Sequence, residues 1–168
     1  MSIPGRAQPV KEYRLEDALE VTGHIILEES EYAAKKKRDD NNDRLSKTSL
    51  RRLYPNYSKN VITSLANVDE SITNYALIAD LIEYICKRKL DEDGAILVFL
   101  SGLGEIKSAM EEISKREGLS DNAVIYPLHS SLSNAEQTAV FQRPPKGKRK
   151  IVLSSNIAET SITIDDVV

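Results

Sequence analysis

The feature that most constrains the fold is an unbroken apolar run, AILVFL, at residues 95–100. A strand with one face in water alternates apolar and polar residues, whereas a strand covered on both faces is apolar throughout. A helical pattern (105–117), an apolar run (123–128), a second helical pattern (133–141) and a third apolar run (150–153) follow it. Strands that alternate with helices through short connections form a parallel sheet. We therefore predict an α/β fold with a mostly parallel sheet flanked by helices, the first strand being covered on both faces.

The first half of the chain has mainly helical patterns. Apolar spacing predicts a helix over 15–21 that ends at Gly23, and a long helix over 71–89. Ser58 is placed to cap a short helix that reaches residue 65. We expect the helix predicted after position 105 to end at Gly118.

Two segments of the first half lack such patterns. Residues 28–52 contain the stretch KKKRDDNNDRLSK, which offers almost nothing to bury, so we predict a flexible, exposed insertion there. Residues 1–14 carry Pro4, Gly5 and Pro9 and are expected to form a connector and a first strand. Residues 15–168 would then form the main domain.

Charge and cysteine content exclude several classes of protein. The formal net charge is −3, which argues against a chain that is basic all over. Residues 31–52 carry eight basic and four acidic side chains and residues 143–150 carry five basic ones; both could meet phosphates or be solvated loops. The single cysteine, Cys86, excludes an internal disulfide and favours a buried apolar role. Without a long apolar span or an apolar leader, we expect an intracellular protein, cytoplasmic or nuclear, that does not enter the membrane.

Small polar residues follow each predicted strand, at residues 101–104 (SGLG), 129–131 (HSS) and 154–156 (SSN). Parallel strands end at the same edge of a sheet, and ligands bind at that edge. Hydroxyls, amides and backbone N–H groups at helix starts bind phosphates, although the same residues also make ordinary turns and caps. Three such segments on one edge favour a binding role. We expect the side chains of Ser155 and Asn156 to point away from the strand core.

Several familiar catalytic patterns are absent from the sequence. The Gly102-x-Gly104 pair lacks the third glycine of a dinucleotide fingerprint, because position 107 is a lysine. No phosphate-binding G-x-x-x-x-G-K-[ST] loop is present, and His129 lacks the G-x-S-x-G context of a serine nucleophile. We therefore expect no catalytic residue and no metal ligand in this chain.

The last segment carries the most specific pattern. Residues 150–168, KIVLSSNIAETSITIDDVV, closely resemble motif V of the DEAH-box (DEAH/RHA) ATP-dependent RNA helicase family. Residues 97–102 (LVFLSG) with Glu105-Ile106 look like motif IV, and residues 128–132 (LHSSL) look like the strand-end motif between them. Residues 4–10 (PGRAQPV) resemble the connector that enters the second RecA-like domain. The chain thus resembles that second domain, truncated before motif VI, without the Walker A, DEAH and SAT motifs of the first.

The resemblance also implies roles for individual residues. It places RNA contacts at Ser101, Gly102, Ser130, Ser155, Asn156 and Thr160. It assigns Ser161 to coupling between RNA and nucleotide, and Thr163 and Asp165 to the nucleotide side. The full-length enzyme would use ATP and Mg²⁺, neither held by this chain alone, so the isolated chain is expected to be inactive.

The implied partners are single-stranded RNA bound without sequence preference, the first RecA-like domain of the same protein, and in some cases a protein cofactor. Lys146, Lys148, Arg149 and Lys150 would add attraction for RNA or form a solubilising loop. Two alternatives stay open: a Rossmann-like nucleotide-binding domain, and a protein-interaction α/β module that uses residues 35–52.

Overall fold

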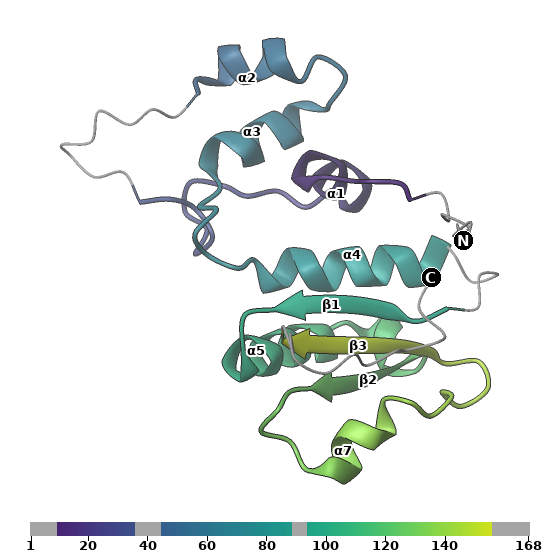
Figure 1. Ribbon diagram of the computed structural model, residues 1–168. Helices are drawn as coiled ribbons and strands as arrows, with labels where there is room; N and C mark the ends of the chain where they lie inside the picture. The colour runs from purple at the N-terminus through teal and green to yellow at the C-terminus, as the bar shows by residue number, and fades with distance from the viewer. Residues whose placement is uncertain (1–9, 36–44, 89–93, 156–168) are drawn as a thin grey trace, which may run out of the picture.

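The computed structural model describes residues 10–35, 45–88 and 94–155 (Figure 1). In these ranges the chain forms seven helices and three strands. Their order is α1 (Leu15–Thr22), α2 (Lys47–Leu53), α3 (Lys59–Asn67), α4 (Tyr75–Arg88), β1 (Ile96–Leu100), α5 (Leu103–Ser114), α6 (Glu117–Ser120), β2 (Ala123–Leu128), α7 (Asn134–Ala139) and β3 (Arg149–Ser155). No described helix is long and apolar enough to cross a membrane.

The described sheet has the strand order β1-β3-β2, and both pairings are parallel. Leu100 of β1 pairs with Ser155, and Leu128 of β2 pairs with Ser154. The carboxyl ends of all three strands therefore lie on one edge, which confirms the predicted parallel α/β fold.

One face of the sheet is covered by α4 and α5, and it holds the main core (Figure 1). Alternate residues of a strand point to the same face, which explains why Ile151 and Leu153 are both buried here. The helices contribute Ala79, Ile82 and Cys86 from α4 and Ile106, Ala109 and Ile113 from α5. Burial raises the pKa of the Cys86 thiol, which disfavours the reactive thiolate and confirms its packing role.

The opposite face is less completely covered among the described residues. Leu128, Val140 and Val152 form a small cluster there, next to β2 and β3. Phe99, on β1 at the sheet edge, is 67% exposed. The prediction that residues 95–100 are covered on both faces is therefore wrong for Phe99, because the small cluster that covers this face packs beside β2.

A second layer of helices lies on the far side of α4 from the sheet (Figure 1). Its core contains Leu19 of α1, Val61 of α3, Ile26 and Ala33, and α4 contributes Leu77. Helix α4 thus packs into both cores. Asp80 of α4 also accepts hydrogen bonds from Arg116 Nε (2.9 Å) and contacts His24 Nδ1 (2.7 Å), which ties the two layers together.

Buried hydrogen bonds hold the segment after α1 against α3. The backbone N–H of Ile26 donates to Ser64 Oγ (2.9 Å), and Asn67 Nδ2 donates to the carbonyl of Ile26 (2.9 Å). Ile26 and Ser64 are fully buried, so neither group could bond to water instead. These two bonds satisfy both backbone groups of Ile26 inside the helical layer.

The predicted flexible insertion at residues 28–52 is partly wrong. Helix α2 begins at Lys47, where the Ser46 side chain accepts from the N–H of Ser49 (3.1 Å), and Leu50 is buried. Ala33 is buried as well and bridges Val68. Packing against neighbouring elements thus orders a sequence with little to bury. Residues 36–44 of this segment lie outside the described residues.

Three element boundaries also differ from prediction. Helix α4 begins at Tyr75 rather than at residue 71, because the Asn74 side chain accepts from the N–H of Leu77 (2.9 Å). Gly118 lies inside α6 instead of ending the preceding helix, since the extended backbone of Arg116 separates α5 from α6. Residues 10–14 contain no strand, and residues 1–9 lie outside the described residues.

The bond between Ile26 and Ser64 leads to a stability prediction. Replacing Ser64 by Ala leaves the buried N–H of Ile26 without its acceptor, and this should lower the free energy of unfolding by about 1–3 kcal/mol. Urea unfolding measures the loss. Ser114→Ala is the control: this exposed hydroxyl bonds to the carbonyl of Glu111 (2.7 Å), and its loss should change stability by less than about 0.5 kcal/mol. Equal losses in the two variants would contradict the role given to Ser64.

A second prediction concerns the carboxylate of Asp17 in α1. It accepts from the backbone N–H of Arg14 (2.8 Å) and from Tyr57 Oη (2.7 Å), and these bonds, the first above all, hold the pKa of Asp17 below its ordinary value of 3.8. The bond to Asp17 raises the pKa of Tyr57 to about 12. The bond between Tyr57 and Asp17 therefore stabilises the fold at pH values between the pKa of Asp17 and that of Tyr57. This stabilisation is lost as pH falls through the lowered pKa of Asp17, and also as pH rises toward 12.

Tyr57→Phe should therefore raise the pKa of Asp17 while leaving it below 3.8, because the N–H of Arg14 still donates. A carbon-detected NMR titration of the Asp17 carboxyl measures the shift. Tyr54→Phe is the matched control, because the Tyr54 ring packs against Tyr57 at 5.9 Å and removing its hydroxyl leaves both bonds to Asp17 in place. A pKa of Asp17 that moves equally in both variants would refute this interpretation.

Candidate functional site

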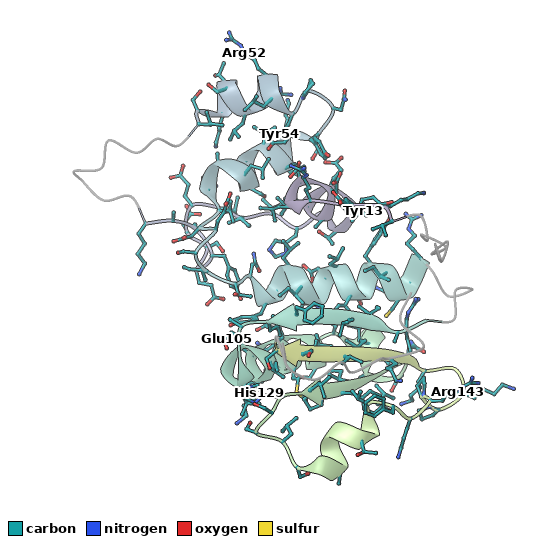
Figure 2. The ribbon with its side chains drawn as sticks, viewed as in Figure 1. Tyr13, Arg52, Tyr54, Glu105, His129 and Arg143 are labelled. Carbon is teal, nitrogen blue, oxygen red and sulfur yellow. The ribbon has the colours of Figure 1, made fainter. Side chains whose placement is uncertain are left out.

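The three predicted polar segments meet at one edge of the sheet. Strand β3 lies between β1 and β2, and adjacent strands are about 4.8 Å apart, so the ends of β1 and β2 lie about 10 Å apart with β3 between them. Figure 2 shows Glu105 and His129, which follow β1 and β2, at this same edge. We call it the strand-end edge, made of residues 101–105, 129–131 and 154–155.

The segment after β1 presents polar groups to solvent. Ser101 is exposed, and Gly102 is the residue before α5, with an extended φ of −175° that any residue could adopt. The first N–H groups of α5 have no partner within their helix and carry a partial positive charge. Glu105 lies in the first turn, where its carboxylate interacts favourably with that charge. A Cβ added to Gly102 would lie 3.2 Å from Glu105 Oε2, so the carboxylate reaches back toward the edge.

The segment after β2 contains His129, Ser130 and Ser131. The backbone N–H of Ser131 donates to His129 Nδ1 (3.1 Å), and Ser131 Oγ lies 2.7 Å from the same nitrogen. A backbone N–H can only donate, so Nδ1 is an acceptor and the neutral ring carries its proton on Nε2. Ser130 is exposed between these two residues. This segment therefore adds a hydroxyl and a ring N–H to the strand-end edge.

The segment after β3 differs from the prediction. Ser154 is 4% exposed and donates through Oγ to the carbonyl of Ser155 (2.8 Å). Ser155 is 8% exposed, and in the alternation of the strand it shares a face with the core residues Ile151 and Leu153. The expectation that the Ser155 side chain points away from the strand core is therefore wrong. The reason is that β3 continues through residue 155 in the middle of the sheet.

The remaining residues predicted for the site belong to residues 156–168, outside the described residues. They are Asn156, Thr160, Ser161, Thr163 and Asp165. Of the predicted RNA-contacting set, the structure thus brings Ser101, Gly102, Ser130 and Ser155 to one edge and leaves the first three at its surface. The roles of all these residues stay predictions.

The predicted basic loop before β3 lies elsewhere. It leads into the start of β3, so it belongs to the edge opposite the strand ends, where Figure 2 shows Arg143. Two of its cations are part of the sheet rather than of a loop. Arg149 Nε donates to the carbonyl of Gly94 (2.9 Å), and Lys150 is 2% exposed with its Nζ 5.9 Å from the centre of the Tyr126 ring. The interpretation of Arg149 and Lys150 as loop cations is wrong, because β3 begins at Arg149.

The described residues contain no group of three or more His, Cys, Asp or Glu side chains that could hold a metal ion. His129 lies directly after β2 at the strand-end edge, as expected from its place in the predicted polar segment 129–131, although the resemblance assigned it no role.

Comparison with known proteins agrees with this architecture. The family described as "Helicase conserved C-terminal domain" matches residues 76–168. The chain is 38% identical over 181 residues to the DExH-box ATP-dependent RNA helicase DExH1 of Arabidopsis thaliana, covering 100% of this chain and 18% of the relative. It is 38% identical over 182 residues to the ATP-dependent DNA/RNA helicase DHX36 of Bos taurus, covering 99% and 18%.

A crystal structure of the E. coli DExH-box NTPase HrpB is also similar, with 31% sequence identity, a TM-score of 0.48, and coverage of 58% of this chain and 12% of that one. The chain spans less than a fifth of the length of the curated relatives it matches. The family match spans more than half of the chain and includes all three strands with the strand-end edge. The chain therefore belongs to the helicase conserved C-terminal domain family, and its resemblance to the DEAH-box RNA helicases is confirmed.

Proposed function

We propose that this chain is the second RecA-like motor domain of an ATP-dependent RNA helicase and that its strand-end edge contacts single-stranded RNA. The observation that carries the proposal is the alignment of polar groups at the ends of adjacent parallel strands, within a region that matches the helicase family. The names of the relatives, which describe RNA and DNA/RNA helicases, support the choice of ligand.

The groups on this edge suit a sugar–phosphate backbone. The hydroxyls of Ser101 and Ser130 are exposed, His129 carries an Nε2 proton in its neutral form, and the first N–H groups of α5 add a partial positive charge. Hydroxyls and backbone N–H groups bind phosphate and sugar oxygens without reading bases. The carboxylate of Glu105 next to them repels phosphate, which limits the affinity. We therefore propose weak binding without sequence preference.

ATP would be shared with a first RecA-like domain of the same protein. Hydrolysis needs a phosphate-binding loop and an acid that holds Mg²⁺, and the sequence contains no such loop. The described residues do not fit a metal site, so we derive no step through Mg²⁺ here. On this chain we propose Thr163 and Asp165 for the nucleotide side and Ser161 for coupling, in the full-length enzyme. We place this enzyme inside the cell, in the cytoplasm or nucleus, and leave room for a protein cofactor.

The proposal predicts the outcome of a binding experiment. The chain should bind labelled single-stranded RNA of mixed sequence with a Kd of roughly 10⁻⁴ to 10⁻⁶ M. The double variant Ser101→Ala, Ser130→Ala removes two exposed hydrogen-bonding groups and should weaken binding about tenfold. Fluorescence anisotropy measures the change.

The control is the double variant Ser114→Ala, Ser120→Ala. These two exposed hydroxyls bond to the carbonyls of Glu111 (2.7 Å) and Glu117 (2.9 Å), in α5 and α6, away from the strand-end edge. This variant should bind RNA like the wild type. If both double variants bind as the wild type does, the strand-end edge is not the RNA contact.

A further inference from the structure

A basic hollow of about 480 Å³ lies between α2 and α3. Four cationic side chains line it: Lys47, Arg51 and Arg52 from α2, and Lys59 from α3. It belongs to the helical layer on the far side of α4 from the sheet, where Figure 2 shows Arg52 at the tip of the molecule. We call this feature, together with its other lining residues, the α2–α3 basic groove.

Helix periodicity brings these cations together. Lys47 and Arg51 are four residues apart and share one face of α2, and Lys59 and Thr63 share one face of α3 in the same way. The turn after Leu53 folds the two faces toward each other. Thr48 and Thr63 add hydroxyls, and the buried side chain of Ile62 provides an apolar floor.

The positive charge of the groove is not neutralised by the described residues. None of its four cations forms a salt bridge with them, and all four side chains are exposed. Among the residues that the structure describes, no acidic side chain lines the hollow. Two acids of α1 bond to other groups: Asp17 accepts from Tyr57, and Glu20 accepts from the N–H of Ser58 (3.1 Å). Like charges four residues apart on a helix destabilise it, so a bound anion would stabilise this surface.

We propose that the α2–α3 basic groove binds the phosphates of single-stranded RNA, as a second contact separate from the strand-end edge. This inference rests on the proposed function for the identity of its ligand. Two arginines next to threonine hydroxyls suit phosphates, because a planar guanidinium group binds two phosphate oxygens through a pair of hydrogen bonds. The described lining of the groove contains no aromatic ring for stacking of bases, so the contact depends on charge and not on sequence.

Salt dependence of RNA binding tests this proposal. For single strands, the slope of log K against log salt changes by about 0.7 for each phosphate contact. The triple variant Arg51→Gln, Arg52→Gln, Lys59→Gln should therefore reduce the magnitude of the slope by about 2 and lower the affinity at low salt. The measurement is anisotropy of a labelled mixed-sequence single-stranded RNA over a series of KCl concentrations. Glutamine keeps a helix propensity near that of arginine and lysine, so both helices should persist.

A charge-matched control separates the groove from net charge. The triple variant Lys87→Gln, Arg88→Gln, Lys115→Gln removes the same charge from three exposed residues outside the groove and the strand-end edge, and it should keep most of the slope. Circular dichroism checks the fold of each variant. If the groove variant does not fold, Lys47→Gln with Lys59→Gln tests the same surface with an expected slope change of about 1.4.

Five outcomes distinguish the proposals. A slope reduced in the groove variant alone supports the inference. Equal reductions in the groove and control variants overturn it, because net charge then explains the binding. If the slope of the groove variant is unchanged while the double variant Ser101→Ala, Ser130→Ala binds RNA more weakly, the inference is overturned and the proposed function stands. If neither variant changes RNA binding, both the inference and the proposed function are refuted. If poly-L-glutamate binds the wild type as tightly as RNA and binds the groove variant less, the ligand is an acidic polypeptide and the RNA assignment is wrong.

Discussion

The parallel pairing of β3 with both β1 and β2 is the constraint on which the rest of the structure depends. It places three strand ends at one edge. Because parallel strands need crossover connections, the connecting helices must cross the faces of the sheet. Helix α4 then covers one face, and its outer side is available to a second layer built from α1 and α3. Leu77 on one side of α4, and Ala79 and Ile82 on the other, thus link the two cores.

This arrangement separates stability from binding. The buried bonds of Ile26 hold the helical layer together, and the contacts of Asp80 join this layer to the sheet layer; none of these bonds involves the exposed groups of the strand-end edge. The surface hydroxyls Ser101 and Ser130 take little part in packing, so they are free to serve a ligand. The RNA-binding role that we propose would benefit from such a division, because ligand contacts can change without disturbing the core.

Much of the fold could be predicted from the sequence, since apolar runs and helical spacing report burial directly. The three strands, α1, and the cap of α3 by Ser58 follow from such local patterns. Features that depend on neighbours in space could not be predicted. Helix α2 has a single buried side chain, Leu50, and forms against α3. Lys150 is buried because it lies within β3, although its charge favours an exposed position. The strand-end edge was predicted, but the burial of Ser155 and the basic groove were not, because both arise from packing between elements.

The central claim is that RNA contacts the strand-end edge, and NMR titration of the ¹⁵N-labelled chain with single-stranded RNA tests it most directly. Amide signals of residues 101–105 and 129–131 should shift on RNA addition. Those of Ala95 and Ala123, which lie where β1 and β2 begin, should stay in place because the opposite edge of the sheet lies far from the ligand. Shifts confined to the opposite edge, or an unchanged strand-end edge at saturating RNA, would contradict this account.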